Sequence, residues 1–204
     1  ALDGESGVVY AYQKEQKGTG HATQCGLNVL HDIGYSGPVI VSMGDKIVSS
    51  SVVSALLKKA GNSKAVLGVQ PISANPQGGH VMMANGKVCG IVEFADAALM
   101  ALDNIPPSEY SKRLDSIGLT GTKAKKVLDR ASLQKPQGIK SLAGHSFTVD
   151  EILKTPYVNA ALYCFDSGAV SAALELCRGD NAQGEIYLTD VIEHFANSED
   201  VEFY

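Results

Sequence analysis

A short glycine-containing segment near the start of the chain has the composition of a ligand-binding loop. It covers residues 16–22 with the sequence QKGTGHA, between an apolar run at 8–13 that predicts a strand and a stretch with helical spacing. Glycines let a ligand approach bare backbone, and the first turn of a helix offers free N–H groups. Gln13 and Thr19 add donors and acceptors that can read the edge of a flat heterocycle. A turn without any ligand is the simpler alternative and stays open, because short glycine motifs often occur by chance.

The composition predicts a globular protein with one domain. The 204 residues are 45% hydrophobic and 19% charged, which is enough for a packed core and too apolar for a disordered chain. The net charge is −5 and no block of lysines or arginines occurs, so we expect no nucleic-acid partner. The apolar runs are far too short to span a membrane and no signal-peptide pattern is present. We therefore expect a cytoplasmic protein that does not enter a membrane.

The cysteines and histidines predict neither a zinc site nor a disulfide framework. The four cysteines stand at positions 25, 89, 164 and 177, too far apart for a metal knuckle. We expect free and mostly buried thiols, as in a reducing cytosol. The five histidines are scattered singly, without the spacing of zinc ligands.

The elements that must position the loop begin with alternating strands and helices. Residues 38–43 form an apolar run expected of a strand buried on both faces, and residues 49–51 offer N-caps for a helix over 52–59. Residues 64–72 predict another strand. Such short β–α–β spacing is typical of a mostly parallel sheet with flanking helices.

A hairpin follows this alternating region. Residues 80–84 and 87–93 flank Asn85-Gly86, and Asn-Gly tolerates the positive φ angles of a two-residue turn. We expect an antiparallel flap at the edge of a mixed sheet.

Residues 98–147 differ in character from the rest. They predict a short capped helix at 108–114 and a basic amphipathic helix at 122–133, followed by a loop that contains Pro136, Gly138 and Gly144. The basic helix could meet a phosphate, although a solvated face is the simpler interpretation. After this segment we expect a strand over 157–165, helices over 166–176 and 191–196, and the beginning of a strand at 201–204.

Three segments in chain order resemble one family. They are Gln13 with residues 16–22, residues 90–97 with the sequence GIVEFADA, and residues 181–190 with the sequence NAQGEIYLTD. They look like the pyrophosphorylase domain of the N-acetylglucosamine-1-phosphate uridyltransferases, in the sugar-nucleotidyltransferase superfamily. Outside residues 98–147 the resemblance covers most of the chain. It implies the Rossmann-like α/β fold of nucleotide-diphospho-sugar transferases, with a mostly parallel mixed sheet over residues 1–204.

The resemblance implies a uridylyl transfer. UTP and a sugar 1-phosphate, N-acetylglucosamine 1-phosphate, would give UDP-N-acetylglucosamine and pyrophosphate. Enzymes manage such transfers by positioning and charge neutralisation. A divalent cation, Mg²⁺, would bridge phosphate oxygens.

The resemblance also assigns site residues. Gln13, Gly18 and Thr19 would hold the uracil, and Asp45, at the C-terminal end of a strand, would ligate Mg²⁺ as the catalytic residue. Tyr187 is a weaker candidate, because core packing explains it equally well. The sugar, its N-acetyl group or its phosphate would be contacted by Gly79, Glu93, Asn159 and Thr189.

Simpler alternatives accompany three of these assignments. Gly44-Asp45 is also a turn-forming pair, and a lone glutamate at a hairpin end is usually solvated. An asparagine in an apolar run is usually satisfied by backbone groups.

The chain also departs from the family pattern. It begins at Ala1 without a Met and without the Gly-rich loop that grips the triphosphate, so we expect a domain truncated by its first βαβ unit. The partner of the metal aspartate and the acetyltransferase β-helix are expected beyond its end. Met43, residues 78–80 (GGH) and residues 159–161 (NAA) differ from the family, and residues 98–147 are interpreted as a helical insertion subdomain.

These departures leave two other functions open. One is a non-catalytic binding or regulatory module with a nucleotidyltransferase-like fold. The other is a pyrophosphorylase for a different sugar 1-phosphate, such as glucose 1-phosphate. The oligomeric state is open as well, a homo-oligomer included.

Overall fold

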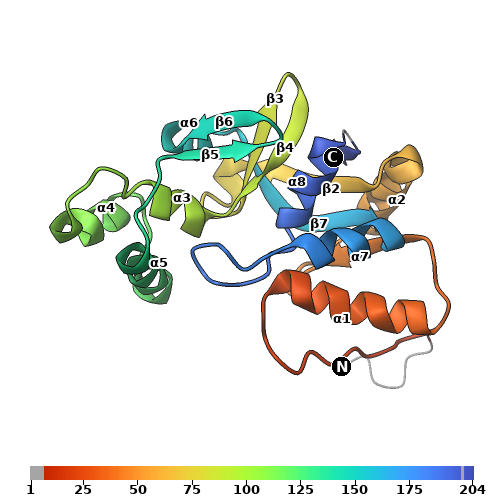
Figure 1. Cartoon of the computed structure of the whole chain (residues 1–204). Helices are drawn as coiled ribbons and strands as arrows, with labels where there is room; N and C mark the ends of the chain where they lie inside the picture. The colour runs from red at the N-terminus through yellow and green to blue at the C-terminus, as the bar shows by residue number, and fades with distance from the viewer. Residues whose placement is uncertain (1–6, 199) are drawn as a thin grey trace.

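A six-stranded mixed sheet forms the centre of the computed structural model, which describes residues 7–198 and 200–204 (Figure 1). The strand order is β4-β3-β7-β2-β8, and β1 also pairs with β7. The strands of this sheet are β1 (Pro38–Ser42), β2 (Ala65–Pro71), β3 (His80–Ala84), β4 (Lys87–Val92), β7 (Tyr157–Asp166) and β8 (Val201–Phe203). A separate hairpin consists of β5 (Ile139–Leu142) and β6 (His145–Thr148).

Helices surround this sheet. The α-helices are α1 (Thr19–Asp32), α2 (Ser50–Lys59), α3 (Phe94–Met100), α4 (Tyr110–Ser116), α5 (Gly121–Leu133), α6 (Val149–Leu153), α7 (Ser167–Leu176) and α8 (Asp190–Asn197). Short 3-10 helices cover Ala60–Asn62, Ile72–Ala74 and Pro107–Glu109. The predicted α/β class, with a mixed sheet between helices, is confirmed.

The direction of the strands corrects the prediction of a mostly parallel sheet. The long strand β7 runs antiparallel to β1, β2 and β3, and only β2 and β8 form a parallel pair among the described strands. β1 and β2 do run in the same direction, as their β–α–β spacing predicts, but β7 lies between them. That strand comes about 90 residues later in the chain, so local spacing could not reveal its insertion.

Two predicted strand features near the N-terminus are wrong. Residues 8–13 form no strand, and Val9 and Tyr12 are exposed. β1 is not buried on both faces, because Val39 is the one buried residue in it. An apolar run becomes a buried strand only where neighbouring strands and helices cover it.

The core follows the alternation of side chains along the central strands. Leu67 and Phe165 face a cluster that includes residues of α1, α7 and α8, whereas Val66 and Cys164 face Leu56 of α2 on the other side of the sheet. The four cysteines are free, and three of them are buried, as predicted. No helix in the described part of the chain is long and apolar enough to cross a bilayer.

Local cues predicted several elements correctly. Ser49 accepts a hydrogen bond from Val52 N at the start of α2, and Asp166 accepts one from Ala169 N at the start of α7. Asn85 and Gly86 have φ angles of 51° and 76°, as the predicted hairpin between β3 and β4 requires.

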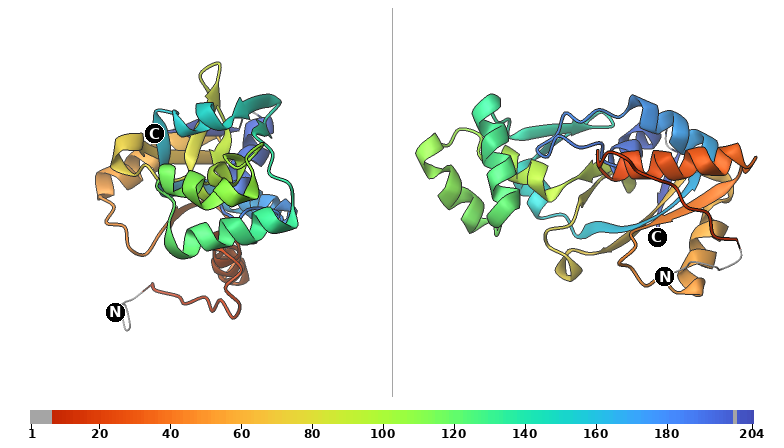
Figure 2. Two further views of the ribbon diagram at one scale, coloured as in Figure 1. Left: turned by 90° about the vertical axis from the view of Figure 1, so that its left-hand side faces the viewer. Right: turned by 90° about the horizontal axis from the view of Figure 1, so that it is seen from below.

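Residues 98–147 combine helices with a second hairpin. The predicted helices at 108–114 and 122–133 are present as α4 and α5, which lie beyond the end of the sheet where α3 begins (Figures 1 and 2). The loop predicted after residue 136 is instead the hairpin β5–β6, whose turn has positive φ angles at Ala143 and Gly144.

Candidate functional site

The predicted nucleotide-binding residues come together at the start of α1. The side-chain amide of Gln13 donates to the carbonyl oxygen of Gly18 over 3.2 Å and lies 3.1 Å from Nδ1 of His21. The hydroxyl oxygen of Thr19 accepts a hydrogen bond from Leu188 N over 3.1 Å. This loop is therefore bound to the segment that precedes α8.

The two glycines of the loop are explained by that same segment. A Cβ atom at Gly18 would lie 2.5 Å from the carbonyl oxygen of Ile186, and one at Gly20 would lie 2.8 Å from Cγ2 of Ile186. Gly20 N donates to the carbonyl oxygen of Ile186 over 2.9 Å. We expected these glycines to leave bare backbone for a ligand. On the side of the loop that faces Ile186 this is wrong, because Ile186 fills the space beside both glycines.

The four predicted sugar-contacting residues form a second group. Thr189 Oγ1 donates to Glu93 Oε1 over 3.0 Å, and a Cβ atom at Gly79 would lie 3.0 Å from the same oxygen. The carbonyl oxygen of Gly79 accepts a hydrogen bond from Asn159 N over 2.8 Å. Residues from β4, β7, the start of β3 and the start of α8 thus meet at one place.

The side chain of Asn159 is engaged within its own strand. Its Oδ1 accepts from Ala161 N over 2.8 Å, and its Nδ2 donates to the hydroxyl of Tyr163 over 2.5 Å. β7 is irregular here, because its pairing with β2 shifts between Leu67 and Val69. The simpler alternative for Asn159, an amide satisfied by backbone groups, therefore describes one of these two hydrogen bonds.

Asp45 stands apart from both groups. It is exposed in the turn after β1. Ser42, the last residue of β1, pairs with Leu162, which is three residues from Asn159 on β7. β1 therefore ends toward the same end of the sheet as the sugar-contacting group.

The carboxylate of Asp45 fits Mg²⁺ as an ion that is shared with a substrate. No group of three or more His, Cys, Asp or Glu side chains in the described residues could hold a metal ion. Mg²⁺ is commonly bound by one or two carboxylates together with substrate phosphates and water. A single exposed carboxylate at Asp45 is compatible with that mode.

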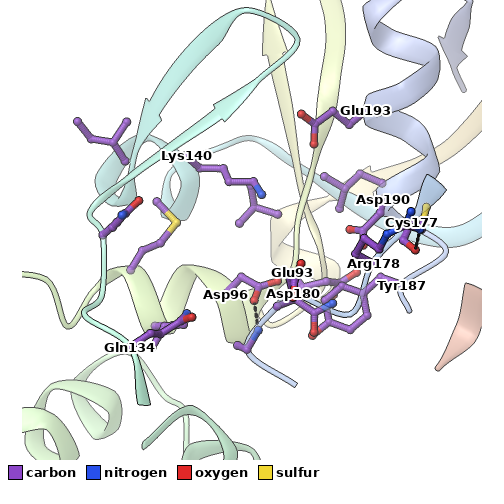
Figure 3. A pocket seen from close by; sticks show the side chains of 18 of the residues that line it. Glu93, Asp96, Gln134, Lys140, Cys177, Arg178, Asp180, Tyr187, Asp190 and Glu193 are labelled. Atoms are coloured by element: carbon purple, nitrogen blue, oxygen red, sulfur yellow. Dashed lines mark hydrogen bonds between the residues drawn. The ribbon is translucent and has the colours of Figure 1, made fainter. Parts of the chain in front are cut away.

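A cavity of about 770 Å³ lies beside Glu93 (Figure 3). Its walls come from the end of β4 and α3, from α8, from the segment before α8, and from residues 134–140 before and in β5. The charged side chains that line it are Glu93, Asp96, Asp180, Asp190, Glu193, Lys135, Lys140 and Arg178.

Burial perturbs the carboxyl groups of this cavity. It raises the pKa of Glu93, an effect that the hydrogen bond from Thr189 opposes. It also raises the pKa of Asp96, although Ala182 N donates to that carboxylate. The pKa of Asp190 rises to about 7, because of burial first and then the negative charge of Asp96, while Lys140 opposes the shift. Clustered carboxyl groups with raised pKa values are typical of functional sites, although structural clusters show them too.

Tyr187 lines the same cavity. Its side chain is 6% exposed, and its Oη has no hydrogen-bond partner within the described residues. Burial raises the pKa of Tyr187, and the charges of Asp96 and Glu93 raise it further, while the neighbouring Gln183 side chain lowers it. Tyr187 is therefore packed, as the simpler alternative stated, and also forms part of the cavity wall.

Asp96, Asp190 and Lys140 are cavity residues that were not predicted from the sequence. Asp96 and Asp190 lie in segments that carry the family resemblance, but a carboxylate in the first turn of a helix is explained by the helix dipole alone. Lys140 had no signal, because β5 was predicted as part of a loop.

Sequence matches to curated proteins cover most of the chain. It is 33% identical over 189 residues to the bifunctional protein GlmU of Mycolicibacterium vanbaalenii, a match that covers 91% of this chain and 28% of the relative. The chain is a homologue of GlmU. It is also 28% identical over 198 residues to the bifunctional protein GlmU of Geotalea uraniireducens, which covers 96% of this chain and 32% of that relative. The resemblance found in the sequence is therefore confirmed, and this GlmU homologue spans about a third of the length of these relatives.

The fold agrees with this relationship. A crystal structure from Bacillus anthracis, described as a glucose-1-phosphate thymidylyltransferase, matches this GlmU homologue with a TM-score of 0.52 and 17% identity. The match covers 97% of this chain and 57% of that one. No protein-family model matches the chain. The chain thus shares sequence with part of GlmU and shares the fold of that crystal structure.

Proposed function

We propose that this domain transfers UMP from UTP to a sugar 1-phosphate, with N-acetylglucosamine 1-phosphate as the acceptor. The products are UDP-N-acetylglucosamine and pyrophosphate. The observation that carries the proposal is the continuity of the two groups of candidate residues. Leu188, which donates to Thr19, adjoins Thr189, which donates to Glu93.

The loop of residues 13–19 acts on the nucleotide side of the reaction. Gln13 and Thr19 orient the uracil, with Gly18 held in its extended, positive-φ conformation by the packing of Ile186. Because the loop is attached to residues 186–188, the base is positioned relative to Thr189. Fixing both substrates on one rigid segment lowers the entropy cost of bringing them together.

The second group acts on the sugar. Glu93 and Thr189 are held together and offer hydrogen-bonding groups to sugar hydroxyls, and the lack of a side chain at Gly79 lets Glu93 pack closely against the backbone there. Asp45 would hold Mg²⁺ together with the phosphates. When bound, that ion neutralises the charge that develops on the phosphate oxygens.

Pyrophosphate release tests this proposal directly. The chain is incubated with UTP, N-acetylglucosamine 1-phosphate and Mg²⁺, and UDP-N-acetylglucosamine is identified by mass. We expect Asp45→Asn to lower the rate at least about 100-fold, and the matched variant Asp115→Asn, on the exposed face of α4, to leave it unchanged. Equal rates for the wild type and Asp45→Asn would refute the role of Asp45, and failure of the wild type to form product would refute the reaction.

A non-catalytic binding module is the second candidate function. It is favoured by one observation: Gln13, Thr19 and Asp45 do not line the cavity beside Glu93. Calorimetry with UDP-N-acetylglucosamine distinguishes the two. Binding without any turnover by the wild type supports the module, whereas turnover excludes it.

A further inference from the structure

The hairpin β5–β6 is firmly attached to the main sheet. Leu142 is 1% exposed and packs among buried residues that include Met82 and Val92. A Cβ atom at Gly90 would lie only 3.2 Å from Cδ2 of Leu142, so the glycine lets the hairpin sit directly on β4. Phe147, on the partner strand, is buried in the same cluster.

The register of the hairpin directs Lys140 toward the cavity. Lys140 is two residues from Leu142 and pairs across the hairpin with Phe147, so these three side chains share one face. Leu142 and Phe147 are buried against the sheet, and Lys140 extends the same face over the cavity, as Figure 3 shows. Residues 134–140 thereby contribute cations to a cavity that the motif-bearing residues Glu93, Asp96 and Asp190 also line.

The ammonium group of Lys140 is not committed to a contact partner. Within the described residues it forms no ion pair, although its charge acts on both Asp96 and Asp190. Arg178, which also lines the cavity, donates from Nη1 to the carbonyl oxygens of Glu175 and Cys177, which ties that end of its guanidinium group to the backbone. Lys140 is therefore available to an anion that enters the cavity.

The cavity offers two kinds of chemistry on facing walls. Glu93, Asp96 and Asp190 present carboxyl groups, which suit the hydroxyl groups of a sugar. The hairpin wall presents Lys140 and, before it, Lys135, which suit a phosphate. A phosphorylated sugar satisfies both walls, whereas a neutral sugar satisfies only the first.

We propose that Lys140 binds the phosphate of the sugar 1-phosphate, so that the inserted hairpin forms part of the acceptor site. This inference rests on the proposed function, because it takes the acceptor to be a sugar 1-phosphate. Removing the charge of Lys140 should therefore abolish this role without disturbing the fold.

Binding without UTP tests the proposal. Amide-resolved NMR titrations compare N-acetylglucosamine 1-phosphate with N-acetylglucosamine in the wild type, Lys140→Met and Lys140→Arg. We expect Lys140→Met to weaken binding of the sugar phosphate at least tenfold and to leave binding of the neutral sugar unchanged. Lys140→Arg restores binding of the phosphate to within about threefold of the wild type. The matched control Lys112→Met, on the exposed face of α4, behaves as the wild type.

Three results would overturn the inference. They are the absence of sugar-phosphate binding in the wild type, unchanged binding in Lys140→Met, and an equal loss of both ligands, which is the mark of a structural role. Uridylyl transfer is measured separately in the same variants. Lys140-dependent binding without any transfer refutes the proposed function alone, and transfer with unchanged binding in Lys140→Met refutes this inference alone.

Discussion

Thr189 Oγ1 donates a hydrogen bond to Glu93 Oε1 over 3.0 Å, which joins the start of α8 to the end of β4 across 96 positions of sequence. Both residues belong to segments that resemble the uridyltransferase family. Their contact unites these segments in space and supplies a hydrogen bond to a carboxylate whose pKa burial raises.

Removing the hydroxyl of Thr189 leaves Glu93 without that donor. We expect Thr189→Val to lower the free energy of unfolding by about 1–3 kcal/mol, because a half-buried carboxylate loses a hydrogen bond. Urea denaturation measures the change. Thr122→Val, on the exposed face of α5, is the control and should lie within about 0.5 kcal/mol of the wild type. A loss no larger than that of the control contradicts the role of this contact.

Gly18 allows the close approach of Ile186 as well as a positive φ angle. Gly18→Ala combines backbone strain with a Cβ atom 2.5 Å from a carbonyl oxygen, so we expect a loss of about 2–4 kcal/mol. Gly34→Ala separates the two effects, since Gly34 has a φ of 79° and open space around it. This control should lose about 1 kcal/mol. Equal losses in thermal or urea unfolding would show that the approach of Ile186 is unimportant.

The raised pKa of Asp190 makes stability depend on pH. Asp190 has a pKa of about 7 in the folded protein, against about 4 when unfolded, so the folded state binds the proton more tightly. Its stabilising contribution is complete below pH 4 and is lost as the pH rises through 7. Asp190→Asn should therefore be less sensitive to this change than the wild type.

Urea unfolding at pH 5 and pH 8 measures this dependence. We expect the wild type to lose on the order of 2 kcal/mol more than Asp190→Asn between these values, after allowance for solvent screening. Asp115→Asn, exposed on α4, should follow the wild type. If the free energy of unfolding changes equally with pH in Asp190→Asn and the wild type, Asp190 is not the source of the pH dependence.

Leu142 anchors the hairpin β5–β6 to the main sheet. Leu142→Ala removes a fully buried side chain and should cost about 2–5 kcal/mol, with loss of amide protection in β5 and β6. Leu133→Ala, at a site that is 80% exposed, serves as the control and should cost less than about 0.5 kcal/mol. Retention of hairpin protection in Leu142→Ala would mean that other contacts hold this element.

Elements with local cues were predictable from the sequence. The Ser49 and Asp166 caps and the Asn85-Gly86 turn each depend on residues within a few positions of one another, and each occurs as predicted. The position of β7 between β1 and β2 depends on pairing across about 90 residues or more, which periodicity does not encode. Residues 8–13 have the composition of a strand but lack a covering partner among the described residues.

The candidate site also has a part that was predictable from the sequence and a part that was not. The family resemblance marked Gly79, Glu93, Asn159 and Thr189, and their proximity required the fold. The second hairpin was missed because Ala143 adopts a positive φ that its residue type does not favour. With that hairpin missed, the place of Lys140 in the cavity wall could not be predicted.

A titration with UDP-N-acetylglucosamine, followed by amide NMR, tests the central claim most directly. The claim is that residues 13–19 and the group around Glu93 form one site for a nucleotide sugar. We predict saturable shifts at Gly18 and Thr19 together with Gly79, Glu93 and Thr189, with the same dissociation constant at each. Shifts confined to one of the two groups, different constants for the two groups, or no shifts at millimolar ligand would contradict it.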